Sequence, residues 1–570
     1  MCGIAGVIML KGEVDAPEAL DRMSAAIAHR GPDGSGKWLS PGRKAAFVHR
    51  RLSILDLSEQ ASQPMHSSDG RYTIVFNGEI YNYLELREQL LKKGVRFVTH
   101  SDTEVLLNGY IHYKDDLLPL LDGMFAFAVW DNDSGSLFCA RDRFGEKPFF
   151  YIKEEGCFLF ASEIKALKAF RGRVDLDPDK LQSYLDGTYS FDDSSGFFKQ
   201  VHSLEPASSL FISADHWQVK KYWRIDLSLK APIARKEEYI EEFRRLFLGS
   251  VRFRLRSDVP VGSSLSGGLD SSAVVCSMSG LTDLPVHTFS ARFEGPKDEG
   301  KWIREVLNKT GVINHEVWPS AEGFVRDLDT MVWHHEFPPG SSSVYAQWCV
   351  MKLASQNKIK VLLDGQGADE YLAGYDELKY YAVWELYRKF RWRSFNRERK
   401  LFKENFGHHG KLGYAFLLDP LAGLLGIRRK VYRNGMDLHD VLKYYTTAKL
   451  GELLRYADRN SMAHGVEVRL PFLSHKLVEF AFSVPSDMIY RDGRTKYILR
   501  EAVKDSLPAA IYNRSDKIGF TPPQEKWMNE PSMVKLIESA GRNLSDLKYK
   551  KGKDSFRQLA AWMLIRKFQE

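Results

Sequence analysis

Residues 259–272 read VPVGSSLSGGLDSS, and this stretch decides the fold of the larger part of the chain. A strand pattern, a loop with two glycines and the start of a helix follow one another here. Backbone N–H groups and the helix dipole make such a helix start an anion site, and glycines let a phosphate approach closely. Asp270 is unusual in a pure anion site, and we interpret it as a ligand for Mg²⁺.

Downstream segments predict an open parallel sheet around this loop. Residues 286–290 and 360–363 read as further strands, and the second runs directly into DGQGADE at 364–370. Loops at the carboxyl ends of parallel strands are where such sheets bind ligands. We therefore expect Asp369 and Asp270 to share the metal.

The chain is too long for one typical domain, because its 570 residues exceed the usual range of about 100–200. Its net charge of +7 is small for this length and does not indicate nucleic acid as a partner. No targeting leader is read. The longest apolar stretch, near 416–427, contains Asp419 and Pro420 and is far short of the about 18 residues of a membrane span.

The five cysteines are scattered and lack the spacing of metal ligands, which suits a reducing compartment and a cytoplasmic protein. Four of them are expected to be buried as small apolar side chains: Cys139, Cys157, Cys276 and Cys349.

The first part of the chain reads as strands with tight turns. Residues 72–76 form a strand pattern that ends at an Asn-Gly pair, while 124–130 and 136–140 predict a hairpin. The strand at 124–130 is apolar on both faces, so each face is expected to be covered. Residues 84–93 read as an amphipathic helix, and layers of helices and sheets are expected.

The second residue of the chain is a cysteine. Once the initiator Met is removed, Cys2 carries a thiol and a free α-amine, and this amine can act as the base for its own side chain. The reference pKa of such an amine, about 7.7–8.0, leaves a useful fraction neutral near pH 7. We interpret Cys2 as a nucleophile.

Several polar motifs lie at strand ends or in loops of this first part, where chemistry can be reached. Together with Cys2 they resemble the class II glutamine amidotransferases, the N-terminal-nucleophile glutaminases. The matching pieces are CGI at 2–4, RGPD at 30–33, RLSI at 51–54, NGE at 77–79, SDTE at 101–104 and ARDRFG at 140–145.

This resemblance implies a role for each matching residue. Cys2 attacks the side-chain amide of glutamine, and the Asn77 amide and Gly78 N–H stabilise the oxyanion, a donor typically worth about 2.7–4 kcal/mol. Arg51 holds the α-carboxylate of glutamine, and two acids receive its α-ammonium group. The glutamine-binding residues are then Arg51, Asn77, Glu79 and Asp102.

The loop at 266–272 is not a P-loop NTPase motif, because no Gly-Lys-Ser/Thr follows it. It resembles the PP-loop of ATP pyrophosphatases, which form acyl-adenylates and release pyrophosphate. The resemblance makes Lys496 a catalytic residue that neutralises the departing pyrophosphate. It implies Asp270 and Asp369 as metal ligands and an ATP site made of Leu265, Ser266, Gly267, Gly268, Asp270, Ser271, Ser272, Asp364 and Gly365.

Both parts, in this order, resemble the glutamine-hydrolysing asparagine synthetase family over nearly the whole chain. The implied fold is α+β and then α/β. An N-terminal-nucleophile α/β/β/α sandwich over 2–215 is followed by a linker at 216–236 and a PP-loop open parallel sheet with helices on both faces over 237–570. The implied small molecules are glutamine, ATP with Mg²⁺, and aspartate, with ammonia passing inside the protein; a homodimer is compatible with the sequence.

Departures from the family concern the acceptor. The family commonly has a glutamate where this chain has Gln366, which cannot serve as a base. Counting back from the strand puts Ser342 in place of an arginine, which weakens the case for an aspartate-like anion. Ser474 replaces a further acid. Two alternatives therefore stay open: the same chemistry on another carboxylate (a peptide, a sugar acid or a specialised metabolite), or a non-catalytic relative that binds a nucleotide.

Residues 388–399 interleave basic and aromatic side chains. Such a run can bind nucleic acid, but it is more often a solvated helix face or a partner surface. The modest net charge favours the second interpretation.

Overall fold

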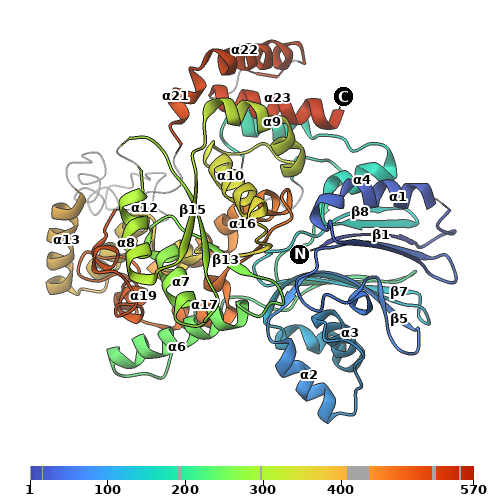
Figure 1. Cartoon of the computed structure of the whole chain (residues 1–570), viewed down its shortest axis with the longest axis horizontal. Helices are drawn as coiled ribbons and strands as arrows, with labels where there is room; N and C mark the ends of the chain where they lie inside the picture. The colour runs from blue at the N-terminus through green and yellow to red at the C-terminus, as the bar shows by residue number, and fades with distance from the viewer. Residues whose placement is uncertain are drawn as a thin grey trace.

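Two antiparallel sheets and one parallel sheet organise the part of the chain that the structure describes (Figure 1). The computed structural model describes residues 2–15, 17–189, 196–295, 298–406, 436–516, 522–547, 549–550 and 554–569. The apolar stretch at 416–427 lies outside these ranges. No helix in the described ranges is both long and apolar enough to cross a membrane.

The first two sheets pack face to face with helices outside them, as an α/β/β/α sandwich (Figure 1). Alternation along β1 sends Ile4 and Ile8 into the layer between the sheets, while Ala5 and Val7 face α1. Helices α1 and α4 cover the sheet β10-β8-β9-β1-β3-β2, and α2 and α3 cover the sheet β12-β11-β7-β6-β5-β4.

The strands of the sandwich are β1 Gly3–Met9, β2 Gly34–Leu39, β3 Ala45–Arg51, β4 Met65–His66, β5 Tyr72–Ile80, β6 Gly123–Asp131, β7 Ser136–Arg141, β8 Phe150–Glu154, β9 Cys157–Ala161, β10 His202–Ser203, β11 Ser208–Ile212 and β12 Trp217–Lys221. Its helices are α1 Pro17–Ala26, η1 Ala28–Arg30, η2 Glu59–Ala61, α2 Tyr83–Lys92, α3 Asp102–Tyr113, η3 Lys114–Leu120, α4 Ile164–Arg171 and α5 Pro178–Leu185.

The sequence predicted most of these elements, with one clear error. The hairpin β6–β7 and the helix α2 are confirmed, and the Ser101 hydroxyl caps α3 by accepting from Thr103 N–H. The strand at 72–76 was wrongly ended at the Asn-Gly pair. In β5 this pair stays in the ladder, where Asn77 opposes Ala126 and Gly78 opposes Phe125, so the glycine serves close strand packing rather than a turn.

A parallel sheet in the order β15-β14-β13-β16-β17 forms the centre of the second part. Helices α7 and α8 lie on one side of this sheet, and α10 and α16 lie on the other (Figure 1). The predicted strands at 286–290 and 360–363 are β14 and β16, on either side of β13. The α/β expectation with helices on both faces is therefore confirmed.

The elements of this part follow. Its strands are β13 Val261–Ser264, β14 His287–Ala291, β15 Ile313–Val317, β16 Val361–Leu363 and β17 Glu467–Arg469. Its helices are α6 Lys236–Arg254, α7 Leu269–Ser279, α8 Gly300–Thr310, α9 Ala321–His335, α10 Ser343–Gln356, α11 Ala368–Tyr371, α12 Asp376–Arg388, α13 Trp392–Phe406, α15 Leu438–Tyr444, the π-helix η4 Tyr445–Lys449, α16 Leu450–Met462, η5 Pro471–Leu473, α17 His475–Ser483, α18 Ser486–Ile489, α19 Tyr497–Ala502, α20 Ala509–Asn513, α21 Gln524–Met528, α22 Pro531–Asp546 and α23 Ser555–Gln569.

The predicted linker at 216–236 begins too early. Residues 217–221 form β12, which pairs with β11 at the edge of the sandwich. Most of this strand is exposed, so its sequence lacks the apolar alternation that marks a half-buried strand. The segment without helix or strand runs over 222–235, and α6 begins at Lys236.

One apolar core crosses from the sandwich to the second part. It joins Leu20 of α1 and Leu181 of α5 to Phe324 of α9 and Phe568 of α23. The C-terminal helix therefore packs on both parts of the chain. Three of the four cysteines expected in the core are buried; Cys157 on β9 is half-buried instead.

A buried ion network closes the same interface. Arg30 donates from Nη1 to Asp458 Oδ2 at 2.8 Å, from Nη2 to Asp458 Oδ1 at 2.9 Å, and from Nη1 to Glu163 Oε1 at 2.8 Å. Arg459 bridges Glu163 and Glu336 at 2.8 Å each. All five side chains are at most 4% exposed. Residues 30 and 163 belong to the sandwich and the other three to the second part, so the network joins the two.

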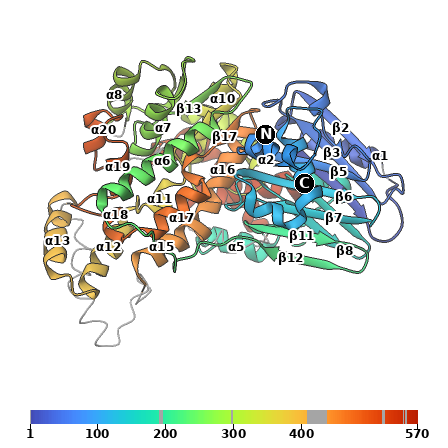
Figure 2. The ribbon, with the colours of Figure 1, turned by 90° about the horizontal axis from the view of Figure 1, so that it is seen from below.

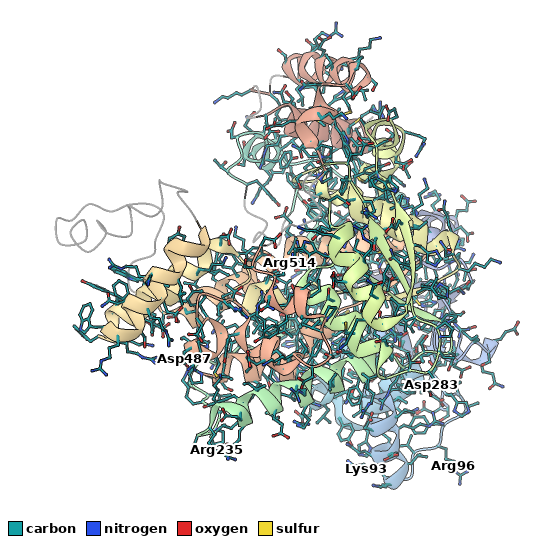
Figure 3. All side chains as sticks on the ribbon, turned by 60° about the vertical axis from the view of Figure 1, so that its left-hand side comes forward. Lys93, Arg96, Arg235, Asp283, Asp487 and Arg514 are labelled. Carbon is teal, nitrogen blue, oxygen red and sulfur yellow. The ribbon has the colours of Figure 1, made fainter. Side chains whose placement is uncertain are left out.

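Helices α12 and α13 form a hairpin that projects from the second part (Figure 2). Phe390 and Trp392 at its turn are 75% and 47% exposed, and Arg391 lies 3.3 Å from Asp487, which Figure 3 labels beside α13. Most of the basic-aromatic run at 388–399 is thus exposed to solvent.

Replacing Asp458 by Asn should destabilise the protein strongly, because it leaves the buried Arg30 with one carboxylate in place of two. Breaking a buried ion pair typically costs about 3–5 kcal/mol. Urea unfolding of the full chain, followed by circular dichroism, measures the loss. The control is Glu155→Gln, which breaks the exposed pair with Lys11 and should change stability little. Equal effects of the two changes would contradict the structural role given to the network.

Candidate active sites

Cys2 lies at the start of β1, in a small pocket of the sandwich. Its backbone N–H donates to Asn77 Oδ1 at 3.0 Å, and its carbonyl accepts from Arg30 Nε at 3.1 Å. The side chain is 9% exposed, and burial raises the pKa of the Cys2 thiol. A thiol with a raised pKa needs a base to ionise it, and the α-amine of a processed N-terminus provides one. The pocket is lined by residues that the sequence picked out: Arg51, Gly78, Glu79 and Asp102.

Asn77 and Gly78 present donors beside this thiol. Asn77 is fully buried, and its Nδ2 has no hydrogen-bond acceptor among the described residues. A buried amide donor without an acceptor costs free energy, so a ligand oxygen would stabilise it. A Cβ on Gly78 would collide with the Met124 carbonyl, which fixes glycine at this position of the ladder.

The two carboxyl groups of the pocket, Glu79 and Asp102, have raised pKa values. Burial, followed by the charge of Glu467, raises the pKa of Glu79 well above its ordinary value. Burial raises the pKa of Asp102 to about 6, while the Ile80 N–H, which donates to its Oδ2 at 2.9 Å, acts in the opposite direction. Two carboxyls poised this way would gain from a cation placed between them.

Arg51, at the end of β3, is half-buried and lines the same pocket. Its guanidinium donates to the carbonyls of Ser58, at 2.7 Å, and Asp56. The loop after β3 therefore holds the cation in place, ready for a carboxylate.

A strand of the second part reaches this pocket. In β17, Arg469 lies 3.2 Å from Glu79 Oε1 and 2.6 Å from Glu467, and all three side chains are buried. Arg469 also opposes Leu363 of β16, and its carbonyl accepts from Asp364 N–H at 3.0 Å. One residue thus touches both the thiol pocket and the loop that begins at Asp364.

The glycine loop after β13 has the geometry of an anion cradle. Gly267 has φ +71°, and a Cβ on it would lie 2.6 Å from Trp302 Cβ and 2.8 Å from Ile303 N. The Gly267 carbonyl accepts from Arg514 Nη1 at 2.9 Å, and Figure 3 labels this arginine near the centre of the second part. The Ser272 hydroxyl is buried without a hydrogen-bond partner among the described residues. The N-terminal N–H groups of α7 open onto this loop.

Lys496, Asp270 and Asp369 converge beside the loop. Lys496 Nζ lies 2.6 Å from Asp369 Oδ1 and also contacts Asp270 Oδ2, although the three residues come from α7, α11 and the start of α19. Lys496 is 6% exposed; burial alone would lower its pKa, but Asp270 and Asp369 raise it. A Cβ on Gly374 would collide with Asp369, so the backbone also holds this carboxylate inward.

These two aspartates fit a divalent cation. Both carboxylates meet at one nitrogen, and carboxylate oxygens are the ligands that Mg²⁺ prefers beside phosphates. Asp364, 7% exposed, lies at the end of β16, and burial raises its pKa to about 6. A Cβ on Gly365 would lie 2.7 Å from Ser271 N, so the two loops of the predicted nucleotide site pack against each other.

The residues predicted to face the acceptor are neutral here. The Gln366 Oε1 atom is buried and accepts no hydrogen bond within the described ranges. The Ser342 hydroxyl donates to Gln524 Oε1 at 2.8 Å, and its N–H donates to the same atom at 3.0 Å. Ser474, 4% exposed, starts α17.

A second group of potential metal ligands lies at the interface of the two parts. Ligand atoms of His29, Glu163 and His334 come within 4.8 Å of one another. Glu163 already pairs with Arg30, Lys165 and Arg459, and a dication among three cations is electrostatically unfavourable. We assign this group to the ion network.

Two families of known proteins match the two parts of the chain. The family described as "Glutamine amidotransferase domain" matches residues 1–223, and the one described as "Asparagine synthase" matches residues 242–560. The chain belongs to the asparagine synthase family. Membership in this family implies the use of ATP.

Named relatives of this family match nearly the whole chain. "Asparagine synthetase [glutamine-hydrolyzing] 3" of Bacillus subtilis is 34% identical over 90% of this chain and 86% of its own length. "Asparagine synthetase [glutamine-hydrolyzing] 1" of the same organism is 33% identical over 93% and 88%. "Amidase chry2" of Gibberella zeae is 29% identical over 94% and 91%.

The sequence does not indicate the partners of the residues that join the two parts. Arg30 stands in the RGPD motif and Arg469 in the run at 467–473, but neither pattern shows that these side chains contact the other part. Their signal is a charged side chain inside an apolar run, as in EVRLPFL at 467–473. A charged residue in an apolar run indicates a buried ion pair more strongly than one in a polar segment does, because a buried charge needs a partner.

Proposed function

We propose that the protein is a glutamine-hydrolysing asparagine synthetase, which converts L-aspartate, L-glutamine, ATP and water to L-asparagine, L-glutamate, AMP and pyrophosphate. The observation that carries the proposal is the contact of β17 with both sites. A thiol pocket and a nucleotide loop joined by one buried arginine suit a reaction that makes ammonia in one place and consumes it in another.

The first half-reaction uses the pocket around Cys2. Its thiolate attacks the side-chain amide carbon of glutamine, and the proton passes to the α-amine and then to the leaving ammonia. Asn77 Nδ2 and the Gly78 N–H donate to the oxyanion. Glutamine is oriented by Arg51 at its α-carboxylate and by Glu79 and Asp102 at its α-ammonium group. Water then releases glutamate from the thioester.

The second half-reaction uses the glycine loop. The ATP site is made of the backbone and hydroxyls of 265–272 together with Asp364 and Gly365, and Asp270 and Asp369 hold Mg²⁺, which would screen the phosphate charge. An aspartate carboxylate attacks the α-phosphorus, pyrophosphate leaves, and ammonia displaces AMP from the acyl-adenylate. Lys496, held charged by two carboxylates, neutralises the leaving pyrophosphate.

Ammonia has to reach the adenylate without protonation by bulk water. Because Glu467 and Arg469 are buried on β17 and the Arg469 carbonyl accepts from Asp364 N–H, an internal path along β17 is part of this proposal. The proposed domains are a glutaminase from residue 2 to the end of β12 and a synthetase from the start of α6 to residue 570. A cytoplasmic location suits these substrates and the absence of disulfides among the described cysteines.

A second candidate keeps both half-reactions but changes the acceptor. Gln366 and Ser342 leave the expected acceptor region without a base or an arginine, and a relative named as an amidase matches the chain along its length. A peptide, a sugar acid or a specialised metabolite would then take the place of aspartate.

Cys2→Ala and Asp270→Asn should have opposite effects. The first should abolish glutamine-dependent synthesis and leave ammonium-dependent pyrophosphate release intact. The second should abolish pyrophosphate release and leave glutamine hydrolysis intact. Coupled assays for glutamate and for pyrophosphate measure both, and Cys157→Ala is the matched control for loss of a thiol. Loss of both activities in each variant would rule out the division of labour.

Glutamine affinity should fall at acid pH. With a pKa of about 6, Asp102 is charged above pH 6 and neutral below it, so its attraction for the ammonium group disappears as the pH falls. From pH 7 to pH 5 the Kd of the Cys2→Ala protein for glutamine should rise about tenfold, because protonation of Asp102 removes its negative charge. Calorimetry measures this change without turnover. In the same background, Asp102→Asn should bind weakly throughout and lose the step near pH 6, whereas an unchanged step would contradict the role of Asp102.

The acceptor is tested by pyrophosphate release with ammonium chloride as the nitrogen source. Aspartate should stimulate release at least tenfold over the rate without an acceptor. Glucuronic acid and a short peptide serve as alternative carboxylates in parallel reactions. Stimulation by one of these and none by aspartate, with glutamine hydrolysis intact, would replace the first candidate by the second.

A further inference from the structure

A cavity of about 580 Å³ lies at the interface of the two parts, outside both active sites. Its walls come from the β7–β8 loop and β12 of the sandwich, from the connecting segment at 223–225, and from η4 and α16 of the second part. This volume lies within the range of about 300–1,000 Å³ that holds small-molecule ligands.

The lining of this cavity is strongly cationic. Seven arginine and lysine side chains face three carboxylates. One of the three, Asp458, is paired with Arg30, and burial together with the charge of Asp142 raises the pKa of another, Glu146, to about 8. At neutral pH Glu146 is therefore mostly uncharged, which increases the imbalance.

Arg141 shows how poorly the positive charge is balanced. Its guanidinium donates to the carbonyls of Gly145, Lys147 and Leu204 and to the Ser203 hydroxyl, all of which are neutral. Burial lowers the pKa of Arg141 to about 10; the charges of Asp142 and Asp458 raise it, while Arg455 and Arg459 act in the same direction as burial. An anion in the cavity would relieve this repulsion.

Two further cations of the lining are available for direct contact. Arg224 is exposed and forms no ion pair within 4.0 Å among the residues that the structure describes, although its charge helps to lower the pKa of nearby Asp226. Lys443 Nζ donates to the Ile225 carbonyl at 2.8 Å, which leaves two of its three hydrogens for a ligand. Both lie where the connecting segment meets η4.

Aromatic rings form the apolar part of the wall. Phe337 lies under Arg455, whose guanidinium carbon is 3.8 Å from the ring centroid, and Phe150 lies 6.2 Å from Phe337. On the other side, Phe144 packs edge-on against Trp223 at 5.2 Å. A ring with an apolar face, such as the C–H face of a sugar, can pack against such a wall while its anionic group meets the cations.

The helical wall has an irregular backbone at this place. Residues 445–449 form one π-helical turn, and Thr446, Thr447 and Ala448 line the cavity. Single π-helical turns are frequent at functional sites, because they displace side chains from the regular helical positions.

We propose that this cavity binds a phosphate ester of a small ring-bearing metabolite, with the phosphate at Arg224 and Lys443 and the ring against the Phe150–Phe337 wall. The assignment goes beyond the proposed synthetase reaction and does not depend on it. A phosphate is preferred to a carboxylate because several separate cations surround the space, and a dianion with three acceptor oxygens satisfies more of them.

The cavity also touches the contact that joins the two parts. Asp458 and Arg459 of α16 line it, and the same residues hold Arg30 and Glu163 across the interface. A bound phosphate would compete with Glu163 and Glu336 for the charge of Arg459. The site is thus placed to adjust how firmly the glutaminase pocket is held.

The test is calorimetric titration of the full chain with glucose 6-phosphate at 0.15 M salt. Saturable binding at one site is expected, at least tenfold tighter than that of inorganic phosphate. Arg224→Gln/Lys443→Gln should weaken the binding of glucose 6-phosphate at least tenfold, and Arg224→Gln alone should weaken it in part. The matched control Lys11→Gln/Lys220→Gln removes two exposed charges outside the cavity and should leave affinity unchanged.

Retained glutamine hydrolysis and an unchanged melting temperature establish that the variants are folded. If the double variant does not fold, the single variant Arg224→Gln provides the test. No binding at 10 mM glucose 6-phosphate would overturn the proposal. Equal affinity in the double variant would also overturn it, because binding would then lie elsewhere. Equal affinity for inorganic phosphate would remove the ring from the assignment and overturn it in its stated form.

Discussion

The two parts of the molecule depend on the buried pairing of Arg30 with Asp458. A guanidinium without exposure to water is tolerable only when carboxylates surround it, so the sandwich is complete only when α16 delivers its aspartate. The same guanidinium donates to the Cys2 carbonyl. The position of Cys2 is therefore set in part by the part of the chain that does not contain it.

Electrostatics divide the work between the two sites. In the thiol pocket, burial and crowded carboxyls raise the pKa values of Glu79 and Asp102, which prepares them for a cationic group. Beside the glycine loop, Asp270 and Asp369 are paired with Lys496. The two carboxylates suit a metal ion, and the lysine suits the negative charge of phosphates. The two sites thus need groups of opposite charge, and Arg469 contacts both of them.

Sequence motifs predicted both layered folds and picked out residues that the structure brings together around Cys2 and around the glycine loop, because glycines, caps and strand patterns are local signals. The glycine loop, the hairpin β6–β7 and the Ser101 cap could all be read within a few residues. Two errors also have local causes. Asn77-Gly78 has the composition of a turn but lies inside a ladder, and β12 is an exposed edge strand without alternation. The contacts of Arg30 and Arg469 span hundreds of residues, and no short pattern encodes such partners.

The double contact of Arg469 has a consequence for protein engineering. A chimera could join this sandwich to the second part of a distant homologue. That second part would need an arginine at the position of Arg469, because Glu79 of the sandwich pairs with it. Without this arginine, Glu79 of the thiol pocket would lose its counter-charge. In the reverse chimera, a sandwich without the acid would leave Arg469 with one carboxylate fewer. The two halves are therefore expected to diversify together, and shuffling of intact full-length chains is a sounder route to new acceptors than exchange of domains.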